Sequence, residues 1–284
     1  MDTLNLIQQM ITEELAREKV PLPVPDIVSS NLQELLGKEN VKIEDISQVV
    51  SQDSSLTAKV LSLANSPFYS GLVKIRSIDQ AITRVGLNAV KSLIMTIIMK
   101  DVFNIEMDFL REEFRQSWKH SLACGICAKK IARQTGLTFL SEDAYLLGLL
   151  HDIGAVLIFN SISKLHQEKP DLELSRAFII ETVYHLHAPV GGAVLKKLHF
   201  NENFCAIVEM HHNAAQFENA KDTLFNILQL SDVLLRNLGI SFFSDSGMEI
   251  AELPAFERLN LNMDFISEIE TSIGDIVSDC EQCL

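Results

Sequence analysis

Apolar residues recur along this chain at the 3.6-residue spacing of amphipathic helices. Few segments alternate every second residue, and the β-branched residues fall mostly inside the helical patterns. The pattern therefore predicts an all-α protein. The predicted helices span 1–19, 26–36, 43–51, 55–65, 78–85 and 88–100 in the first part of the chain, and 109–135, 141–159, 174–198, 202–213, 223–238 and 263–280 in the second.

Breaks in the pattern set the organisation of the chain. The segment Val20–Pro25 holds three alternating prolines, which cannot lie inside a helix and favour an extended backbone. The segment Ser66–Gly71 is predicted to be a loop, and Gly136 and Gly239 are expected to end helices. Because the pattern weakens around 103–108, we expect two parts. Residues 1–105 would form a smaller N-terminal helical subdomain, and residues 106–284 a larger helical bundle with a C-terminal helix.

Charge and composition exclude some function classes. The 24 lysines and arginines against 38 acidic residues give a net charge of −14, which repels nucleic-acid backbones. A small phosphorylated ligand held at a local metal site remains compatible with this charge. The uncharged apolar run Ser92–Met99 is too short for a membrane span. The segment Met1–Arg17 is amphipathic and acidic, unlike a secretory signal. We expect a cytoplasmic protein that does not bind nucleic acid or membranes and is a monomer or a dimer.

The five cysteines do not form a disulfide pattern, and they fit a reducing compartment. Two Cys-x-x-Cys pairs, Cys124/Cys127 and Cys280/Cys283, have enough thiolates for a zinc site. The first pair lies inside an apolar helical pattern, however, and the second lies near the C-terminus. We favour the interpretation that they are small core residues and part of a frayed tail.

A polar dipeptide, His151-Asp152, stands in the middle of a strongly apolar stretch. Burying an unpaired polar group costs roughly 1–3 kcal/mol, and burying a charge costs more, so these side chains require partners. Helical spacing places other ionisable residues on core-facing stripes, with His212 at the edge of one stripe. The candidate metal ligands are His120, His151, Asp152, His187, His211, His212 and Asp232.

Imidazole and carboxylate groups suit iron, manganese, zinc or nickel, so this set predicts a site for divalent or iron ions. The alternative is a group of separate buried histidines, each hydrogen-bonded to the backbone or to another histidine. The remaining histidines, His166, His185 and His199, lie in polar surroundings or off the apolar face, and we expect them to be solvated.

The order of His120, His151-Asp152 and Asp232 resembles the H…HD…D signature of the HD superfamily, which contains helical metal-dependent phosphohydrolases and their inactive relatives. The resemblance implies an HD-domain-like helical bundle in the second half. The positions of His187 and the pair His211-His212 are similar to the extra ligands of the HD-GYP cyclic-dinucleotide phosphodiesterases. This similarity implies room for a second metal ion, with Asp152 as the bridge.

Three stretches of the first half resemble the HDOD family: Leu22–Pro25, then Gln52–Tyr69, which contains Leu-Ala-Asn-Ser-Pro-Phe-Tyr, and then Ile75–Leu87. The resemblance covers about residues 20–240. It implies a bacterial, cytoplasmic module linked to signal output and, in general, without a demonstrated catalytic activity.

Three positions depart from the active HD-GYP pattern. Ala155 stands where those enzymes carry a phosphate-holding lysine, and Gln116 stands where some have an acidic ligand. Residues 213–216 replace the Gly-Tyr-Pro loop. We expect no lysine or arginine near these motifs to clamp a phosphate, because the local positive charge comes only from Lys119, Lys129, Lys130, Lys196 and Lys197.

Three hypotheses follow. The first is a non-catalytic or weakly active signalling module with a metal-binding HD site, whose partner is a signalling protein or a small phosphorylated ligand. In that case the Asn65–Tyr69 loop would either form a binding surface or pack between the two halves. The second is a metal-dependent phosphohydrolase of the phosphodiesterase type. The third is an iron or metal sensor that uses the same ligands.

Overall fold

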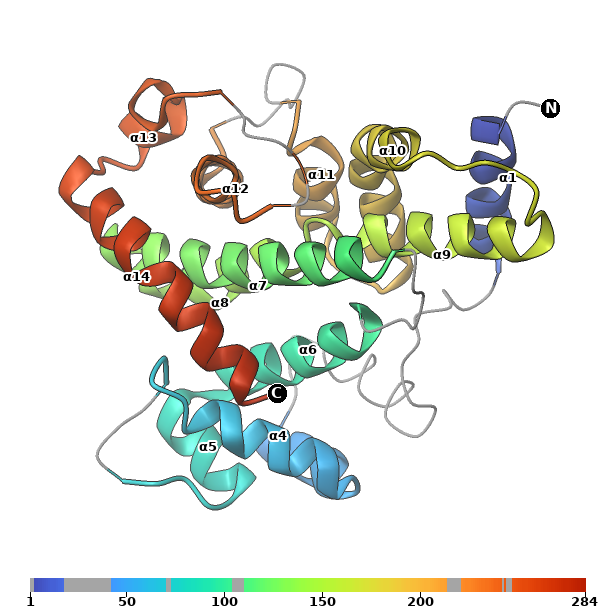
Figure 1. Cartoon of the computed structure of the whole chain (residues 1–284). Coiled ribbons are helices and arrows are strands. Elements are labelled where there is room, and N and C mark those ends of the chain that lie inside the picture. The colour runs from blue at the N-terminus through green and yellow to red at the C-terminus, as the bar shows by residue number, and fades with distance from the viewer. Residues whose placement is uncertain are drawn as a thin grey trace.

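The computed structural model describes residues 3–17, 42–69, 73–103, 110–213, 221–241, 243 and 247–284. All regular elements within these ranges are helices and none is a strand, so the predicted all-α fold is confirmed (Figure 1). The proline run, the predicted helix at 26–36 and the predicted boundary between residues 105 and 106 lie outside the described residues.

The helices follow the predicted order closely. The first part contains α1 (Thr3–Ala16), α3 (Ile43–Ser51), α4 (Ser54–Ala64), α5 (Ile78–Val85) and α6 (Leu87–Phe103). The second part contains α7 (Arg111–Gln134), η1 (Thr138–Leu140), α8 (Ser141–Leu150), α9 (Ile153–Glu168), α10 (Arg176–Lys197), α11 (Glu202–Met210), α12 (Thr223–Asn237), η2 (Ile250–Glu252), α13 (Pro254–Arg258) and α14 (Met263–Gln282). The short elements η1, η2 and α13 were not predicted.

Local sequence explains where several helices begin and end. Asp53 caps α4 by accepting hydrogen bonds from the backbone N–H groups of Ser55 and Leu56. Gly136 and Gly239 follow α7 and α12 with φ of 78° and 70°, the left-handed conformation that glycine adopts without a steric cost. The prediction that these two glycines end helices is confirmed.

One predicted helix, 141–159, is wrong as a single element. The chain forms α8 and α9 instead, with a turn at His151-Asp152. Asp152 has φ −99° and ψ 14°, which lies outside the regular helical region. A continuous helix would rotate these neighbouring side chains apart by about 100°. The turn instead allows both to face the same interior point.

The buried apolar residues form two cores. The smaller core comprises residues of α3 to α6, and the larger comprises residues of α1 and of α6 to α14. Helix α6 contributes to both: Val90 and Leu93 lie in the smaller core, and Met99 and Phe103 lie in the larger one. Helix α6 is therefore the shared wall between the two halves.

Helices α1 and α14 do not pack only within the parts of the chain to which the sequence assigned them. Helix α1 packs against α9 and α10, and its Ile7 and Ile11 belong to the larger core. Helix α14 runs from α13 along α7 towards α4 and α6, as Figure 1 shows. Its Cys280 is buried, and Cys283 packs on the smaller core. The expectation of a frayed tail is therefore wrong, because this helix is packed against both halves.

The Asn65–Tyr69 segment is a packed structural element. The Asn65 side-chain amide donates to the carbonyl oxygens of Leu61 and Ile75 and accepts from the Ile75 N–H group, which pins the start of the following segment. Phe68 and Tyr69 stack edge to face, with ring centroids 4.9 Å apart. These contacts favour the interpretation that the segment packs between the halves.

A buried lysine completes this junction. Lys129 of α7 has no exposed side-chain area, and its ammonium group donates to the Tyr69 hydroxyl at 3.0 Å. The same ammonium group lies 4.4 Å from the centroid of the Tyr69 ring and 5.3 Å from that of Tyr145. The Lys129 ammonium group thus joins the first half to α7. It pairs with Glu142 and lies against the rings of Tyr69 and Tyr145.

One stretch of the described chain, Thr138–Glu168, is long and apolar enough to cross a membrane. In its most apolar window 89% of the residues are buried among other helices. Core packing accounts for this composition.

Candidate metal centre

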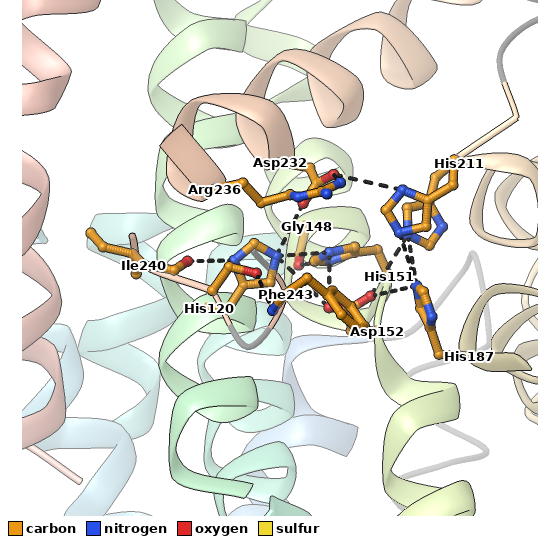
Figure 2. Close-up of polar contacts among 12 residues, drawn as sticks. His120, Gly148, His151, Asp152, His187, His211, Asp232, Arg236, Ile240 and Phe243 are labelled. Atoms are coloured by element: carbon orange, nitrogen blue, oxygen red, sulfur yellow. Dashed lines mark hydrogen bonds and ion pairs between the residues drawn. The ribbon is translucent and has the colours of Figure 1, made fainter. Parts of the chain in front are cut away.

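The structure brings all seven predicted site residues together in the larger core (Figure 2). They come from separate elements: His120 from α7, His151 and Asp152 from the turn between α8 and α9, His187 from α10, His211 and His212 from the end of α11, and Asp232 from α12. The core-facing positions expected from helical spacing are confirmed, because six of the seven residues are at most 5% exposed. His212, expected at the edge, retains 20% of its side-chain exposure.

Two glycines permit the helix contacts that assemble this group. A Cβ on Gly148 of α8 would lie 2.6 Å from the backbone of Cys124 on α7, one turn after His120. A Cβ on Gly154 of α9 would lie 2.1 Å from the carbonyl oxygen of His187 on α10. Only glycine fits at such distances, and the close approach brings His120 beside His151 and His187 beside Asp152.

Backbone carbonyls fix the orientation of four imidazole rings. Each ring places Nδ1 within hydrogen-bond distance of a carbonyl oxygen: His120 with Ile240 at 2.7 Å, His151 with Gly148 at 2.7 Å, His187 with Val183 at 2.8 Å and His211 with Val208 at 2.7 Å. A carbonyl only accepts, so Nδ1 must donate, and in a neutral ring Nε2 then carries the lone pair. Metal-binding histidines commonly donate their other ring N–H to a carbonyl or carboxylate oxygen in this way, which fixes the ring orientation.

The Nε2 atoms face one another instead of facing donors. Nε2 of His120 lies 3.2 Å from that of His151. Nε2 of His187 lies 3.3 Å from that of His211 and 3.0 Å from that of His212. Two neutral rings that both donate through Nδ1 cannot share a proton through Nε2. The arrangement therefore needs a proton or a cation between the rings.

Asp152 lies between the two sets of histidines. Its Oδ2 atom is 3.4 Å from Nε2 of His151 and 3.7 Å from Nε2 of His120. Its Oδ1 atom is 3.3 Å from Nε2 of His187 and 3.7 Å from Nε2 of His211. Oδ1 is buried and accepts no hydrogen bond among the described residues. One carboxylate thus presents a different oxygen to each set.

The pKa values follow from burial and from this crowding. Burial, reinforced by His212, holds the pKa of His211 well below its usual value, and burial lowers the pKa of His212 to about 4. Burial raises the carboxyl pKa of Asp152, but the surrounding histidines, His151 first, bring the net pKa below the usual range. These shifts favour an anionic Asp152 and neutral His211 and His212 at neutral pH, which are the protonation states that bind metals.

His120 differs from the other rings. Burial lowers its pKa, but a hydrogen bond to Asp232, at 3.2 Å between Nε2 and Oδ1, and the charge of Asp152 raise it overall. The raised pKa favours a proton on His120 when no cation is bound. A metal ion beside Asp152 and Asp232 would take the place of that proton.

Helix α12 also supplies a cation that sequence reasoning missed. Nη1 of Arg236 lies 3.8 Å from Oδ2 of Asp232, one turn earlier on the same helix, as Figure 2 shows. The expectation that no arginine stands near the motifs is wrong, since spacing by four residues places both side chains on one face. Tyr184, three residues before His187, was also missed; its ring centroid lies 5.7 Å from that of His212.

The other positions singled out from the sequence do not belong to the groups suited to a metal ion among the described residues. Gln116 donates its side-chain N–H to Glu112, one turn further from His120. Ala155 is buried and places no cation near the site. Residues 214–216 lie outside the described residues. His185 and His199 are exposed as predicted, whereas His166 is half-buried. Among the described residues, the groups suited to a metal ion contain no cysteine.

The donor set fits a metal. The ligand atoms form two groups, one from His120, His151 and Asp152 and the other from His187, His211 and His212. Within each group the ligand atoms lie within 4.8 Å of one another. Nitrogen and carboxylate oxygen donors without thiolate suit manganese, iron, zinc or nickel. Asp152 and Asp232 supply the negative charge that a divalent ion requires.

Comparison with known proteins supports this architecture. The model of the HDOD domain family matches residues 22–214. An uncharacterized protein of Treponema pallidum (strain Nichols) is 24% identical over 222 residues, which are 76% of this chain and 42% of that protein. The uncharacterized protein YuxH of Bacillus subtilis (strain 168) is 27% identical over 135 residues, 48% of this chain and 32% of that protein. The chain thus spans less than half the length of these relatives.

Solved structures show the same fold along nearly the whole chain. An HDOD domain protein of unknown function from Geobacter sulfurreducens is 25% identical, with a TM-score of 0.73 and coverage of 99% of this chain and 98% of that one. A protein of Shewanella amazonensis SB2B, provisionally assigned as a metal-dependent phosphohydrolase, is 19% identical, with a TM-score of 0.63 and coverage of 95% and 99%. The family model and these folds agree with the motifs in both halves, and the chain belongs to the HDOD family.

Proposed function

We propose that this chain is a regulatory HDOD module that holds two metal ions in its larger half and transmits signals through binding, with little or no catalysis. One group would be His120, His151, Asp152 and Asp232. The other would be His187, His211 and His212, with Asp152 contributing its second oxygen. Its partners would be a signalling protein or a small phosphorylated ligand in a bacterial cytoplasm.

The observation that carries this proposal is that the Nε2 atoms of neighbouring histidines face one another around Asp152. Four rings direct Nδ1 to carbonyl oxygens, so in their neutral forms the facing Nε2 atoms of His120 and His151, 3.2 Å apart, and of His187 and His211, 3.3 Å apart, carry lone pairs on both sides. The buried Oδ1 atom of Asp152 accepts no hydrogen bond among the described residues. Separate buried histidines would each satisfy both nitrogens, since an unmet buried polar group costs about 1–3 kcal/mol. A pair of cations satisfies all of these atoms at once.

The test is elemental analysis of the full chain purified without chelator. The wild type is expected to carry metal, and Asp152→Ala is expected to carry almost none, because each group loses an oxygen of the same carboxylate. Asp171→Ala, which removes an exposed carboxylate from a loop, is the matched control and should retain wild-type metal content. A wild type without metal, or Asp152→Ala with wild-type content, would contradict the proposal.

A phosphohydrolase is the second candidate, and it is favoured by Arg236 beside Asp232. In such enzymes a bound metal lowers the pKa of a water molecule and polarises a phosphoryl oxygen. Here the histidines and aspartates would hold the ions, and Arg236 would orient an anionic group. The absence of a cation at Ala155 argues for low turnover. Hydrolysis of phosphoesters or cyclic dinucleotides by the metal-loaded wild type, abolished in Asp152→Ala, would establish this second function.

An iron or metal sensor uses the same ligands without a substrate. Redox cycling of an iron-loaded protein, followed by absorbance and by partner binding, distinguishes this case. A spectrum and a binding affinity that do not change between the two oxidation states would exclude an iron-based redox sensor.

A further inference from the structure

A pocket of about 620 Å³ lies in the smaller half of the protein, and none of its lining residues belongs to the metal centre. Three segments distant in sequence form its walls: one face of α4, the segment that leads into α5, and the end of α14 (Figure 1). Helix α4 contributes Ala58, Leu61 and Ser62, the segment contributes Lys74–Arg76, and Cys283 follows α14. This volume is within the range of pockets that hold small molecules.

The backbone that carries two cations of this pocket is held in place. Ile75 is buried, and both of its main-chain groups bond to the Asn65 side chain: the N–H donates to Oδ1 at 2.8 Å, and the carbonyl accepts from Nδ2 at 2.9 Å. The N–H group of Arg76 donates to Oε1 of Gln80 at 2.8 Å. Lys74 and Arg76 flank the buried residue and line the same pocket. Both cationic side chains therefore extend from a fixed backbone.

These two cations have no acidic partner among the described residues. Neither the Lys74 ammonium nor the Arg76 guanidinium forms an ion pair there, and the described lining of the pocket contains no carboxylate. Asp79, which borders the other side of Lys74, accepts a hydrogen bond from Ser47. Exposed lysines and arginines are common on protein surfaces. Two of them at one pocket without a carboxylate are a local exception in a chain with a net charge of −14.

We propose that this pocket binds a small phosphate monoester, with Lys74 and Arg76 as its recognition residues. A phosphate monoester group carries about −1.5 to −2 charges at neutral pH, which two cations offset, whereas a carboxylate carries one. The guanidinium donates paired N–H groups to two phosphoryl oxygens, and the ammonium acts as a point charge. The Ser62 hydroxyl is a further donor. Ala58 and Leu61 offer an apolar wall to the organic part of the ester.

The site has a position from which it can act on both halves of the protein. Cys283 directly follows α14, and α14 packs along α7, the helix that carries His120. A ligand between α4 and the end of α14 would stabilise the contact of this helix with the smaller half. The inference goes beyond the proposed function and needs no metal ion, although a small phosphorylated ligand is one of the partners proposed above.

The test measures the binding of phenyl phosphate to the full chain by calorimetry. Wild type, Arg76→Gln and Lys74→Gln are compared with Lys196→Gln, a matched control that removes an exposed lysine of α10. Each pocket variant is expected to bind at least about tenfold more weakly, and the control should match the wild type. Arg76→Lys should be intermediate, because an ammonium cannot donate the paired N–H groups. Asp152→Ala should bind like the wild type, because the pocket contains no candidate metal ligand.

Thiol labelling locates the bound probe. Cys283 is half-buried, whereas the other four cysteines are buried, so iodoacetamide should alkylate Cys283 first in the native protein. Phenyl phosphate is expected to slow this alkylation in the wild type and in Lys196→Gln, and much less in Arg76→Gln. Mass spectrometry of the C-terminal peptide measures the rate.

Four results would overturn the inference: no binding of phenyl phosphate to the wild type, wild-type affinity in both Gln variants, loss of binding in Asp152→Ala, or unchanged alkylation of Cys283 at a saturating concentration of the probe. Succinate binding as tight as that of phenyl phosphate would overturn the phosphate class. Binding by a wild type that holds no metal would support this inference and contradict the proposed function. If the Gln variants do not fold, Arg76→Lys decides, and wild-type affinity in that variant overturns the inference.

Discussion

The ammonium group of Lys129 lies 2.6 Å from Oε1 of Glu142, and none of the lysine side chain is exposed. This ion pair joins α7, which carries His120, to α8, which ends at Leu150 just before His151. The other oxygen of Glu142 accepts a hydrogen bond from the Ser92 hydroxyl of α6. The same helix pair therefore holds part of the candidate metal centre towards one end and the N-terminal half towards the other.

Removal of this lysine is expected to destabilise the protein without emptying the metal centre. In Lys129→Met the carboxylate of Glu142, which is only 17% exposed, loses its cation, and breaking such a pair costs about 3–5 kcal/mol. Urea unfolding should show this loss, and elemental analysis should show unchanged metal content. The double variant Lys129→Met/Glu142→Leu should recover most of the stability, because it leaves no unpaired charge. A single variant as stable as the wild type would contradict the expectation.

The pH dependence of this difference has a defined sign. Burial, which outweighs the attraction of Glu142, lowers the pKa of Lys129 to about 8 from its usual 10.5. Between these values the unfolded chain binds a proton on the amine that the folded chain has released. Raising the pH through this window therefore favours the folded state. The free energy of unfolding of the wild type should rise relative to that of Lys129→Met between pH 8 and 10.5. The exposed Lys196→Met should show no such trend, and a narrowing difference would contradict the assignment.

The two groups of ligands should be separable by substitution. His212→Ala should remove about half of the bound metal, because His212 belongs only to the group with His187 and His211. His120→Ala should affect the other group. Metal content and the electron paramagnetic resonance signal of Mn²⁺-loaded protein provide the measurement. His199→Ala, an exposed histidine outside the centre, is the control. Complete loss of metal in His212→Ala would indicate one cooperative site.

Metal binding should stabilise the fold, because a cation gives the Nε2 lone pairs that face one another a partner. A ligand at about 100 times its Kd adds about 2.7 kcal/mol to the free energy of unfolding. For a chain of this size such a change raises Tm by roughly 5–10 °C. Thermal unfolding with Mn²⁺ and after chelation should show this difference in the wild type, with little change in Asp152→Ala. Equal Tm values for the loaded and chelated wild type would argue against metal binding to the native state.

Gly154 should be essential to the position of His187. A Cβ there would lie 2.1 Å from the His187 carbonyl oxygen and 2.5 Å from the N atom of Gly191, so α9 and α10 must separate in Gly154→Ala. We expect a loss of about 1–3 kcal/mol of stability and reduced metal content. Gly274→Ala on α14 is the matched control, because nothing lies within 4 Å of its added Cβ. That control should be neutral or up to about 1 kcal/mol more stable. Equal metal content in both variants would contradict this role of Gly154.

The sequence by itself determined the all-α class, the positions of most of the described helices, the seven candidate site residues and the family. These features are local: periodicity assigns each side chain to a face, and the HDOD phrases lie in contiguous stretches. Their spacing was sufficient to predict that His120, His187, His211 and Asp232 point inward. It also suggested Asp152 as a bridge, through the resemblance to the HD-GYP enzymes.

Only the tertiary structure decided which faces meet. The division of ligands between the two Asp152 oxygens depends on the α8–α9 turn and on the close contacts at Gly148 and Gly154. Lys129 appeared in sequence as one more basic residue, but packing buries it against Glu142 and Tyr69. These relationships join residues distant in the chain. They are set by shape complementarity between helices, which helical periodicity cannot encode.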